Sequence, residues 1–512
     1  MKLKWIGFVL LLCCSTGAVA SAKSKPLITW QPHGIAAFKQ AAKEKKFLIL
    51  DLEAVWCHWC HVMDAKTYAD KQVAAYIKQH FIPLKADHDA RPDLAERYRE
   101  WGWPATIVFA PDGTEIVKRA GYINPENMLK LLKAIVNDPT AEGQQVSLPA
   151  RFSDSYILDD RVKKTLVERN VSSHDAKLGG LLIDQRFVDV DTIEWDLHLA
   201  AQGDKEAEER VRRTLDAGMA LIDPEFGGVY QYSTDSDWQH PHYEKIMRSQ
   251  WSNLRAYSLA AMQLKEKRYT LAAEKIGQYL LDFMRSQEGA FYNSQDADLT
   301  QGVTSHDYFA LSRAERLQQG VPRIDKHLYA SSNGMAIEGL LLLHQATENV
   351  LYYDKAVDAM AWALKNRRYA DGGFRHNQVD DAGPYLSDTL FMGRALLQLY
   401  LNSGDKQVLA LAGKAGTFIN QRFRHPQAGL VSAVDNGTPA KPVPQIEQNI
   451  VAARFALALY QHTGDKLYAD LAKHILRYLN TQEIALAQLT EAGILLADVD
   501  RQHFLSDKLV NR

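Results

Sequence analysis

The stretch that decides the fold of the first third of the chain is residues 47–63, which read FLILDLEAVWCHWCHVM. Apart from one carboxylate, its first six residues are hydrophobic, the pattern of a strand that a sheet buries on both faces. Two cysteines with two residues between them follow, and a helical pattern continues from Met63 to Ile77. The sequence therefore predicts a buried strand, a short loop and a helix that begins at Cys57 and Cys60.

The start of a helix gives these cysteines a particular chemistry. Unpaired backbone N–H groups and the positive end of the helix dipole favour the thiolate, which is the nucleophile in disulfide exchange. His58 lies between the two cysteines and His61 follows them, so both histidines can add positive charge at the same end. The pattern predicts a reactive dithiol.

Residues 1–22 have the pattern of a secretory signal peptide. Two lysines precede an apolar run from Trp5 to Leu12, and small residues follow up to Ala22. The run is well short of the roughly 20 residues that span a bilayer, so we expect cleavage and no stable membrane insertion afterwards. The mature protein is expected in the periplasm or outside the cell.

Cleavage would leave Cys57 and Cys60 as a lone pair, because the other two of the four cysteines are Cys13 and Cys14. A structural disulfide framework in an exported chain of this size is spread over distant loops. A single close pair is typical of a working dithiol.

The length of 512 residues is too great for one ordinary core, so at least two domains are expected. Hydrophobic residues make up 46% of the chain and charged residues 24%, which is typical of a globular protein. The formal net charge is only -2, and no basic stripe is present. The balance argues against a nucleic-acid partner.

Strands and helices alternate over residues 23–138, which we take as the first domain. Their order, with the dithiol after the second strand, resembles the thioredoxin fold. Asp51, Lys85 and Pro104 carry the resemblance further, since thioredoxins keep a buried aspartate, a neighbouring lysine and a cis-proline at these places.

The resemblance implies a role for each of these residues. Cys57 attacks a disulfide, Cys60 resolves the mixed disulfide, and Asp51 beside Lys85 moves the proton to and from Cys60. Pro104 and Trp103 dock the substrate backbone. Substrate contacts are expected from Trp56, His58, Trp59 and Trp103. The implied partners are protein thiol or disulfide clients and a redox partner that the sequence does not identify.

The string Cys-His-Trp-Cys-His-Val-Met at 57–63 is similar to the signature of the spermatogenesis-associated protein 20 family, whose members join a thioredoxin-like domain to a helical toroid. The chain departs from that family at Trp56, where a serine or threonine is usual, and at Trp101 and Gly102, where a glycine pair is usual. These departures bring its redox role closer to that of thioredoxin.

Three alternatives use the same residues. Cys-x-x-Cys-His is also the attachment signature of a c-type haem, although the buried strand before it and the strand after Pro104 have no place in a helical haem domain. A zinc site at Cys57, Cys60 and the two histidines is disfavoured because adjacent residues on one turn do not easily close a tetrahedron. Asp51 and Lys85 could be only a buried ion pair. We expect no metal and no cofactor.

The chain changes character after a polar stretch at 139–153, which we interpret as a linker. Apolar residues then recur every three or four positions, as in helices. We pair the helices of residues 154–512 into six hairpins, over 156–201, 204–264, 267–317, 333–369, 384–423 and 446–482. This half resembles the (α/α)6 toroids of six-hairpin glycosidases and of N-acylglucosamine epimerase-like proteins. The expected fold is an α/β thioredoxin-like domain followed by an all-α toroid.

Sugars bind in toroids of this kind among the loops at the helix ends. The pocket candidates are His240, His242, Glu244, Asp296, Asp298, His376, Tyr385 and Asp388. Glycoside hydrolysis needs two carboxylates at a set separation, which a sequence does not give. Our first hypothesis is an exported thiol–disulfide oxidoreductase whose toroid binds or positions a client. The alternatives are a carbohydrate-binding or carbohydrate-active toroid with a regulatory dithiol, and a non-enzymatic interaction protein.

Overall fold

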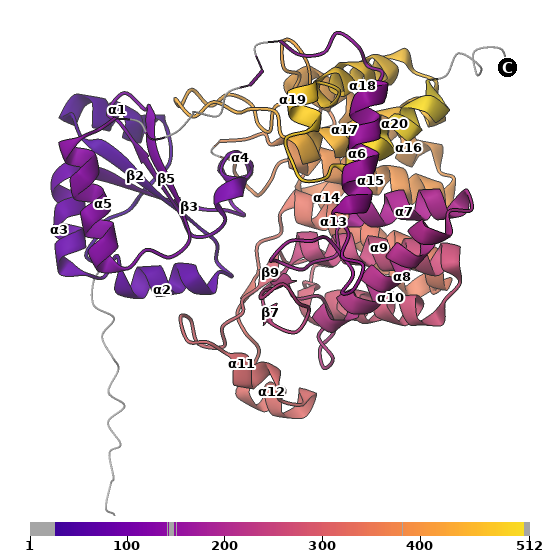
Figure 1. Ribbon diagram of the computed structural model, residues 1–512, viewed down its shortest axis with the longest axis horizontal. Helices are drawn as coiled ribbons and strands as arrows, with labels where there is room; N and C mark the ends of the chain where they lie inside the picture. The colour runs from indigo at the N-terminus through magenta and orange to yellow at the C-terminus, as the bar shows by residue number, and fades with distance from the viewer. Residues whose placement is uncertain (1–25, 141, 143–147, 150, 381, 506–512) are drawn as a thin grey trace, which may run out of the picture.

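The computed structural model describes residues 26–505, except 141, 143–147, 150 and 381. An α/β domain, indigo in Figure 1, lies beside a larger helical domain coloured from magenta to yellow. The expected signal peptide at 1–22 and part of the expected linker lie outside the described residues. Among the residues described, no helix has both the length and the hydropathy that crossing a membrane requires.

The α/β domain is built on a five-stranded sheet with the order β1-β3-β2-β4-β5. The central strand, β2, runs parallel to β3 and antiparallel to β4. Its side chains are buried on both faces of the sheet, which explains why it is hydrophobic almost throughout. The strands are β1 (Gln31–Pro32), β2 (Phe47–Glu53), β3 (Phe81–Asp87), β4 (Ala105–Phe109) and β5 (Glu115–Ala120).

Helices cover both faces of this sheet. Leu48, Leu50 and Leu52 pack with α1 (Ile35–Glu44) and α4 (Pro92–Arg97) on one face. The alternate residues pack with α2 (His58–Lys66), α3 (Lys71–His80) and α5 (Pro125–Asn137) on the other. The arrangement is the thioredoxin fold that the sequence predicts.

The helical stretch expected from Cys57 to Ile77 is two helices, α2 and α3. They separate at Asp70, whose side chain accepts hydrogen bonds from the backbone N–H groups of Gln72 and Val73. An aspartate that caps a new helix competes with continuation of the old one.

The helical domain is a closed ring. Six inner helices pack side by side, and the last returns to the first. The inner helices are α7 (Val190–Ala201), α9 (Met247–Leu264), α13 (Ala330–Thr347), α15 (Leu386–Ser403), α17 (Ile446–Thr463) and α20 (Ala492–Phe504). The outer helices are α6 (Asp160–Ser172), α8 (Lys205–Gly218), α10 (Lys267–Tyr279), α14 (Val350–Asn366), α16 (Lys406–Arg422) and α18 (Lys466–Leu479). This is the (α/α)6 toroid that the sequence predicts.

Two of the expected hairpins differ from the structure. The segment 267–317 is not a pair, because between α10 and α13 the chain makes an excursion that includes two short helices and two short strands. The sixth inner helix is α20, which lies beyond the expected limit of 482. The short elements of the toroid are η2 (Met219–Leu221), β6 (Tyr232–Ser233), β7 (Pro241–His242), β8 (Lys245–Ile246), η3 (Leu280–Met284), β9 (Ser294–Gln295), α11 (His306–Phe309), α12 (Arg313–Gln319), β10 (Ile324–Asp325) and α19 (Gln482–Ala485).

A buried charge cluster ties this excursion to the ring. Lys245 and Arg316 both have fully buried side chains, and both pair with Asp223, which is also fully buried. The distances to the Asp223 carboxylate are 2.8 Å from Lys245 Nζ and 2.9 Å from Arg316 Nη1. Because buried charges are tolerated only when they are paired, this cluster fixes the position of α12 against the toroid.

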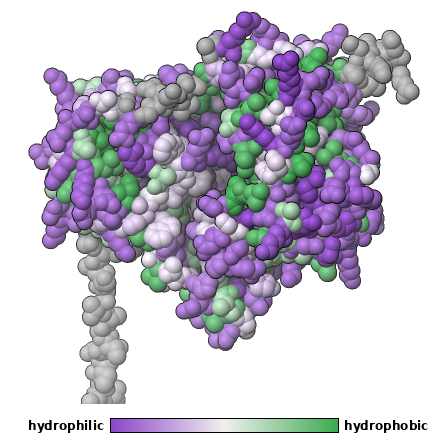
Figure 2. Space-filling view, in the orientation of Figure 1, coloured by the Kyte–Doolittle hydropathy of each residue, from purple (hydrophilic) through white to green (hydrophobic). Residues whose placement is uncertain are grey.

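The surface that Figure 2 shows is mainly hydrophilic on both domains, with apolar areas scattered over it. Scattered apolar residues are normal on a soluble protein.

Candidate functional site at the domain interface

Cys57 and Cys60 are joined by a disulfide at the start of α2, as the position of the pair in the sequence predicts. Cys57 is the N-cap residue, and its sulfur accepts a hydrogen bond of 3.1 Å from the backbone N–H of Cys60. Cys57 is only 4% exposed and Cys60 only 2%. The disulfide is thus enclosed, and the groups that enclose it define the site.

Asp51 lies in the middle of β2, where its register partner on β3 is Lys85. The Lys85 ammonium is 3.0 Å from one carboxylate oxygen of Asp51, while the other oxygen has no hydrogen-bond partner among the described residues. Burial raises the pKa of Asp51 to about 7, although the Lys85 charge opposes the shift. A carboxyl group that titrates near neutrality is suited to proton transfer.

Lys85 also pairs with Glu53 and Asp64, each at 2.7 Å. The carboxylates of Asp51, Glu53 and Asp64 converge closely enough for a metal ion. The Lys85 ammonium occupies the point at which they meet, and the three charges raise its pKa. The arrangement is a partly buried ion cluster that already contains its cation.

An apolar group from both domains encloses the disulfide. Ala54 and Trp56 pack with the two cysteines, and Trp103 and Ile246 pack against them. Trp103 precedes Pro104 through a cis peptide bond, as the thioredoxin resemblance implies. Because Ile246 belongs to β8 of the toroid, the second domain forms part of the wall around the sulfurs.

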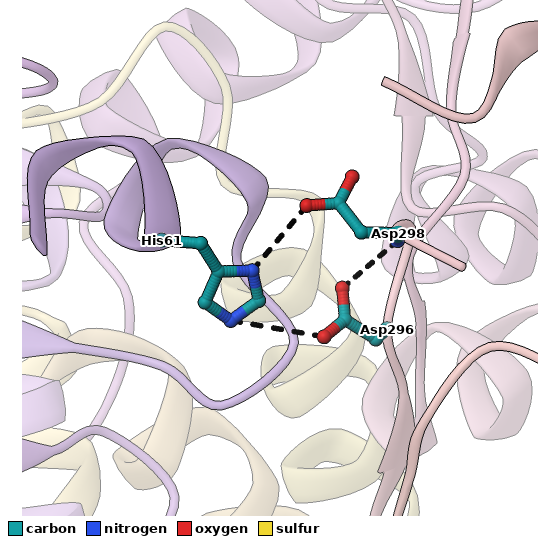
Figure 3. Close-up of side chains that lie close together, drawn as sticks. All are labelled: His61, Asp296 and Asp298. Carbon is teal, nitrogen blue, oxygen red and sulfur yellow. Dashed lines mark hydrogen bonds and ion pairs between the residues drawn. The ribbon is translucent and has the colours of Figure 1, made fainter. Parts of the chain in front are cut away.

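The two histidines of α2 point to carboxylates of the toroid. His58 Nδ1 is 2.8 Å and 2.9 Å from the two carboxylate oxygens of Asp298. His61 Nδ1 is 3.3 Å from Asp298 Oδ2, and His61 Nε2 is 3.7 Å from Asp296 Oδ2 (Figure 3). Asp298 thus contacts both histidines of the dithiol helix from the second domain.

Both ring nitrogens of His61 have an acceptor, since Nε2 also lies 3.1 Å from the backbone carbonyl of Val55. Burial lowers the pKa of His61, but the hydrogen bond to Asp298 and the charges of Asp296 and Asp298 outweigh this and raise it. An imidazolium donates from both nitrogens, whereas a metal needs a free lone pair on one of them. His61, Asp296 and Asp298 lie close enough together for a metal, but their bonding fits an ion pair.

Asp89 makes a second contact between the domains. Its Oδ2 accepts hydrogen bonds from Trp56 Nε1 at 2.8 Å and from the Asn293 amide at 2.7 Å. Its backbone carbonyl lies 2.7 Å from His376 Nε2, and His376 Nδ1 is paired with Asp388. The sequence reasoning missed Asp89, although its place directly after a buried strand, at the sheet edge that bears the dithiol, was a usable signal.

A third contact is a network of opposite charges. Arg99 of the α/β domain pairs with Glu447 of α17. Arg248 of α9 lies 3.3 Å from Glu447 and 3.3 Å from Glu96 of α4. The docking of the two domains therefore involves α2, the loop after β3, and α4.

The toroid residues predicted to line a sugar pocket fall into three places. Asp296, Asp298, His242 and Glu244 gather near the histidines of α2, with Glu244 buried 3.7 Å from His242. His376, Asp388 and Tyr385 cluster near the loop after β3 and the start of α4. His240 is on an exposed hairpin, paired with Asp237. Seven of the eight thus face or adjoin the α/β domain.

The predicted substrate-binding residues also differ in their surroundings. Trp56 is buried, and its ring centre is 5.5 Å from that of Trp103. Trp59 is 45% exposed, with its ring centre 5.8 Å from that of Tyr122. His58 is held by Asp298. Trp59 is therefore the member of this set that an approaching molecule can reach.

A cavity of about 120 Å³ lies between the domains. Trp103 Nε1 and Ser387 Oγ, both in its wall, are buried and have no hydrogen-bond partner among the described residues. Other lining residues are Asn293, Tyr329, Ser332 and His376. Because buried polar groups are normally satisfied, this cavity suits a small polar guest.

The family model Thioredox_DsbH, described as a protein of unknown function, DUF255, matches residues 15–143. The front of the chain carries a DUF255 domain. The chain is homologous to human spermatogenesis-associated protein 20, with 25% identity over 307 residues, which are 53% of this chain and 39% of the human protein. The match therefore spans about two-fifths of that relative.

Two further similarities extend over the toroid. The uncharacterized protein B0495.5 of Caenorhabditis elegans is 26% identical over 91% of this chain and 83% of its own length. The structure of cellobiose 2-epimerase from Spirochaeta thermophila superimposes with a TM-score of 0.53, covering 69% of this chain and 97% of that one at 11% identity. At that identity the likeness shows the toroid fold alone.

The stability of the folded protein around the histidines of α2 is expected to fall as the pH rises from about 5 to 8. Burial raises the pKa of Glu244 to about 7 and that of Asp296 to about 6, and the pKa of His61 is raised by its carboxylate partners. Each group binds its proton more tightly in the folded protein, so its stabilisation is present below its unfolded pKa and lost as the pH passes its folded pKa.

The denaturant midpoint of the first unfolding transition, followed at pH 5, 6, 7 and 8, measures this effect. Glutamine in the His61→Gln variant is polar but cannot be charged. The denaturant midpoint of this variant should therefore fall less than that of the wild type between pH 5 and 8. A wild-type midpoint that stays constant or rises between pH 5 and 8 contradicts the expectation.

Proposed function

We propose that this chain is a thiol–disulfide oxidoreductase that uses Cys57 and Cys60, with the toroid controlling access to the dithiol. The observation that carries the proposal is the disulfide at the start of α2, next to the buried pair of Asp51 and Lys85. This arrangement supplies a sulfur that the helix start favours as thiolate and a carboxyl group whose pKa, raised by burial, is suited to moving its proton.

The enclosure of the sulfurs supports a role for the toroid as a selector. Ile246 and Asp298 reach the dithiol turn from the second domain, so a protein client meets Cys57 only after these contacts open. Trp59 stays exposed beside the closed disulfide and offers a first point of contact. The proposed clients are proteins with accessible disulfides or thiols.

Reduction of insulin by the full-length chain, with dithiothreitol as the electron source, tests the proposal. Catalysed precipitation of the insulin B chain at a rate above that of dithiothreitol alone is the expected result. A rate equal to that of the reductant alone, over the whole accessible pH range, would sink it.

We also propose that the reaction takes place outside the cytoplasm. Support comes from the lysines, apolar run and small residues of the first 22 positions and from the lone pair of cysteines that remains after them. Fractionation of an expressing cell, followed by the mass of the protein in each fraction, tests this: a product cleaved near Ala22 outside the cytoplasm is expected, and an uncleaved product found only in the cytoplasm contradicts it.

A second candidate function is binding of a small carbohydrate in the cavity between the domains. Its volume of about 120 Å³ is below the roughly 300 Å³ of an ordinary ligand pocket, which limits a guest to about monosaccharide size. The indole N–H of Trp103 and the hydroxyl of Ser387 belong to residues that line the cavity, and both are buried without a hydrogen-bond partner among the described residues.

Calorimetric titration of the full-length chain with mannose, glucose and cellobiose tests this candidate. Saturable binding of a monosaccharide, weakened roughly threefold to tenfold in Ser387→Val by loss of one hydrogen bond, is expected. Cellobiose, a disaccharide too large for a cavity of about 120 Å³, serves as the matched control. The absence of saturable heat with all three sugars would remove the candidate.

A further inference from the structure

Asp298 comes from the toroid, yet its hydrogen bonds are made mainly to the dithiol helix. Its side chain is only 2% exposed. It accepts from His58 at 2.8 Å and 2.9 Å, from His61 at 3.3 Å and from the backbone N–H of Gly302 at 2.8 Å. Burial raises the pKa of Asp298, but these hydrogen bonds outweigh it and bring the pKa to about 2, so Asp298 is a carboxylate at neutral pH.

His58 is the residue after Cys57 and the first residue of α2. A positive ring at this place stabilises a thiolate and therefore the reduced form of the pair. Asp298 contacts the dithiol turn through the imidazole rings of His58 and His61, which are the residues directly after Cys57 and Cys60. The Asp298 carboxylate raises the pKa of His61 and thus favours a proton on the residue that follows Cys60.

We propose that Asp298 of the toroid is a positioning residue that raises the reduction potential of the Cys57–Cys60 couple by holding His58 and His61. The inference rests on the proposed thiol–disulfide function and adds that the redox centre is shared between the domains. A residue 238 positions after Cys60 thereby sets the driving force of the exchange reaction.

The reaction that defines this potential balances as follows. Dithiothreitol gives two electrons and two protons and closes to its own disulfide. The Cys57–Cys60 bond breaks, Cys60 takes one proton, Cys57 remains a thiolate, and the second proton goes to the solvent. Stabilisation of the Cys57 thiolate draws this equilibrium toward the reduced protein.

The test is the equilibrium constant between the full-length chain and dithiothreitol at pH 7, for wild type and for Asp298→Asn. Asparagine keeps the shape and an acceptor oxygen but removes the charge. The expected result is an equilibrium constant shifted roughly tenfold toward the oxidised protein, equal to a potential about 30 mV lower.

Glu447→Gln is the matched control, because it weakens another contact of the same interface, with Arg99 and Arg248, without touching either histidine. Its equilibrium constant should stay within about twofold of wild type. In a His58→Gln, His61→Gln background, Asp298→Asn should have no further effect, since residues that act through one another are non-additive.

Three results would overturn the inference: an unchanged or higher potential in Asp298→Asn, an equal shift in Glu447→Gln, or a full shift in the background without the histidines. Should Asp298→Asn not fold, the double histidine variant decides alone, and it must have the lower potential. The potential is measured without a client, so failure to reduce insulin sinks the proposed function and leaves this result standing, and the reverse also holds.

Discussion

Replacing Cys57 with serine is expected to lower the rate of insulin reduction by roughly 1,000-fold or more, to the rate of the reductant in the buffer. A serine hydroxyl at the start of α2 is not ionised near neutral pH and cannot form the mixed disulfide through which the exchange proceeds. The measurement is the initial rate of B-chain precipitation with the full-length variant.

Cys60→Ser is the matched control, since it removes the other half of the same disulfide. In this variant Cys57 should still attack the client, but no Cys60 thiol is present to resolve the mixed disulfide. The mixed disulfide should therefore accumulate, appear as a mass increase and disappear with excess reductant. A Cys57→Ser variant that forms such an adduct, or retains more than a tenth of the wild-type rate, contradicts the assignment of Cys57 as the nucleophile.

Asp223→Asn is expected to cost about 3–5 kcal/mol of stability in the toroid. The change keeps the shape of the side chain and its hydrogen bonds to backbone N–H groups, but leaves Lys245 and Arg316 buried without a counter-charge. The denaturant midpoint of the helical signal measures the loss.

Burial already lowers the pKa of Lys245 to about 8, so without Asp223 this lysine loses its proton more readily. The unfolded chain then binds more protons than the folded one, and the variant should gain stability as the pH rises from 7 to 9. Glu126→Ala breaks an exposed ion pair with Lys130 and should leave the midpoint unchanged. Equal midpoints for the two variants would show that the buried cluster is not needed.

The thioredoxin half of the fold was predictable because its signals are local. The apolar run over 47–52, the thiols directly after it and the helical pattern beyond them lie within one short stretch of chain. Strand register then brings Asp51 beside Lys85 without any further information. The closed ring was predictable in outline from helical periodicity, but α20 escaped notice because it is separated from the last expected hairpin by α19 and a bend.

The enclosure of the site was not predictable in the same way. The sequence predicted Asp296 and Asp298 as members of a sugar pocket. Nothing in the sequence around them indicates that their partners are His58 and His61. That pairing depends on how two finished domains dock. Asp89 and Asn293 meet for the same reason, although they are 204 positions apart.

The closure of the ring by α20 against α7 has a consequence for the newly made protein. The ribosome releases the α/β domain first, and at roughly 5–20 residues per second the synthesis of the chain from residue 138 to residue 492 takes on the order of 20 to 70 seconds. Throughout that interval no complete toroid exists to shield the thiols. During synthesis Cys57 and Cys60 are therefore open to oxidants and neighbouring proteins until the ring is complete and holds Ile246 and Asp298 against the dithiol turn.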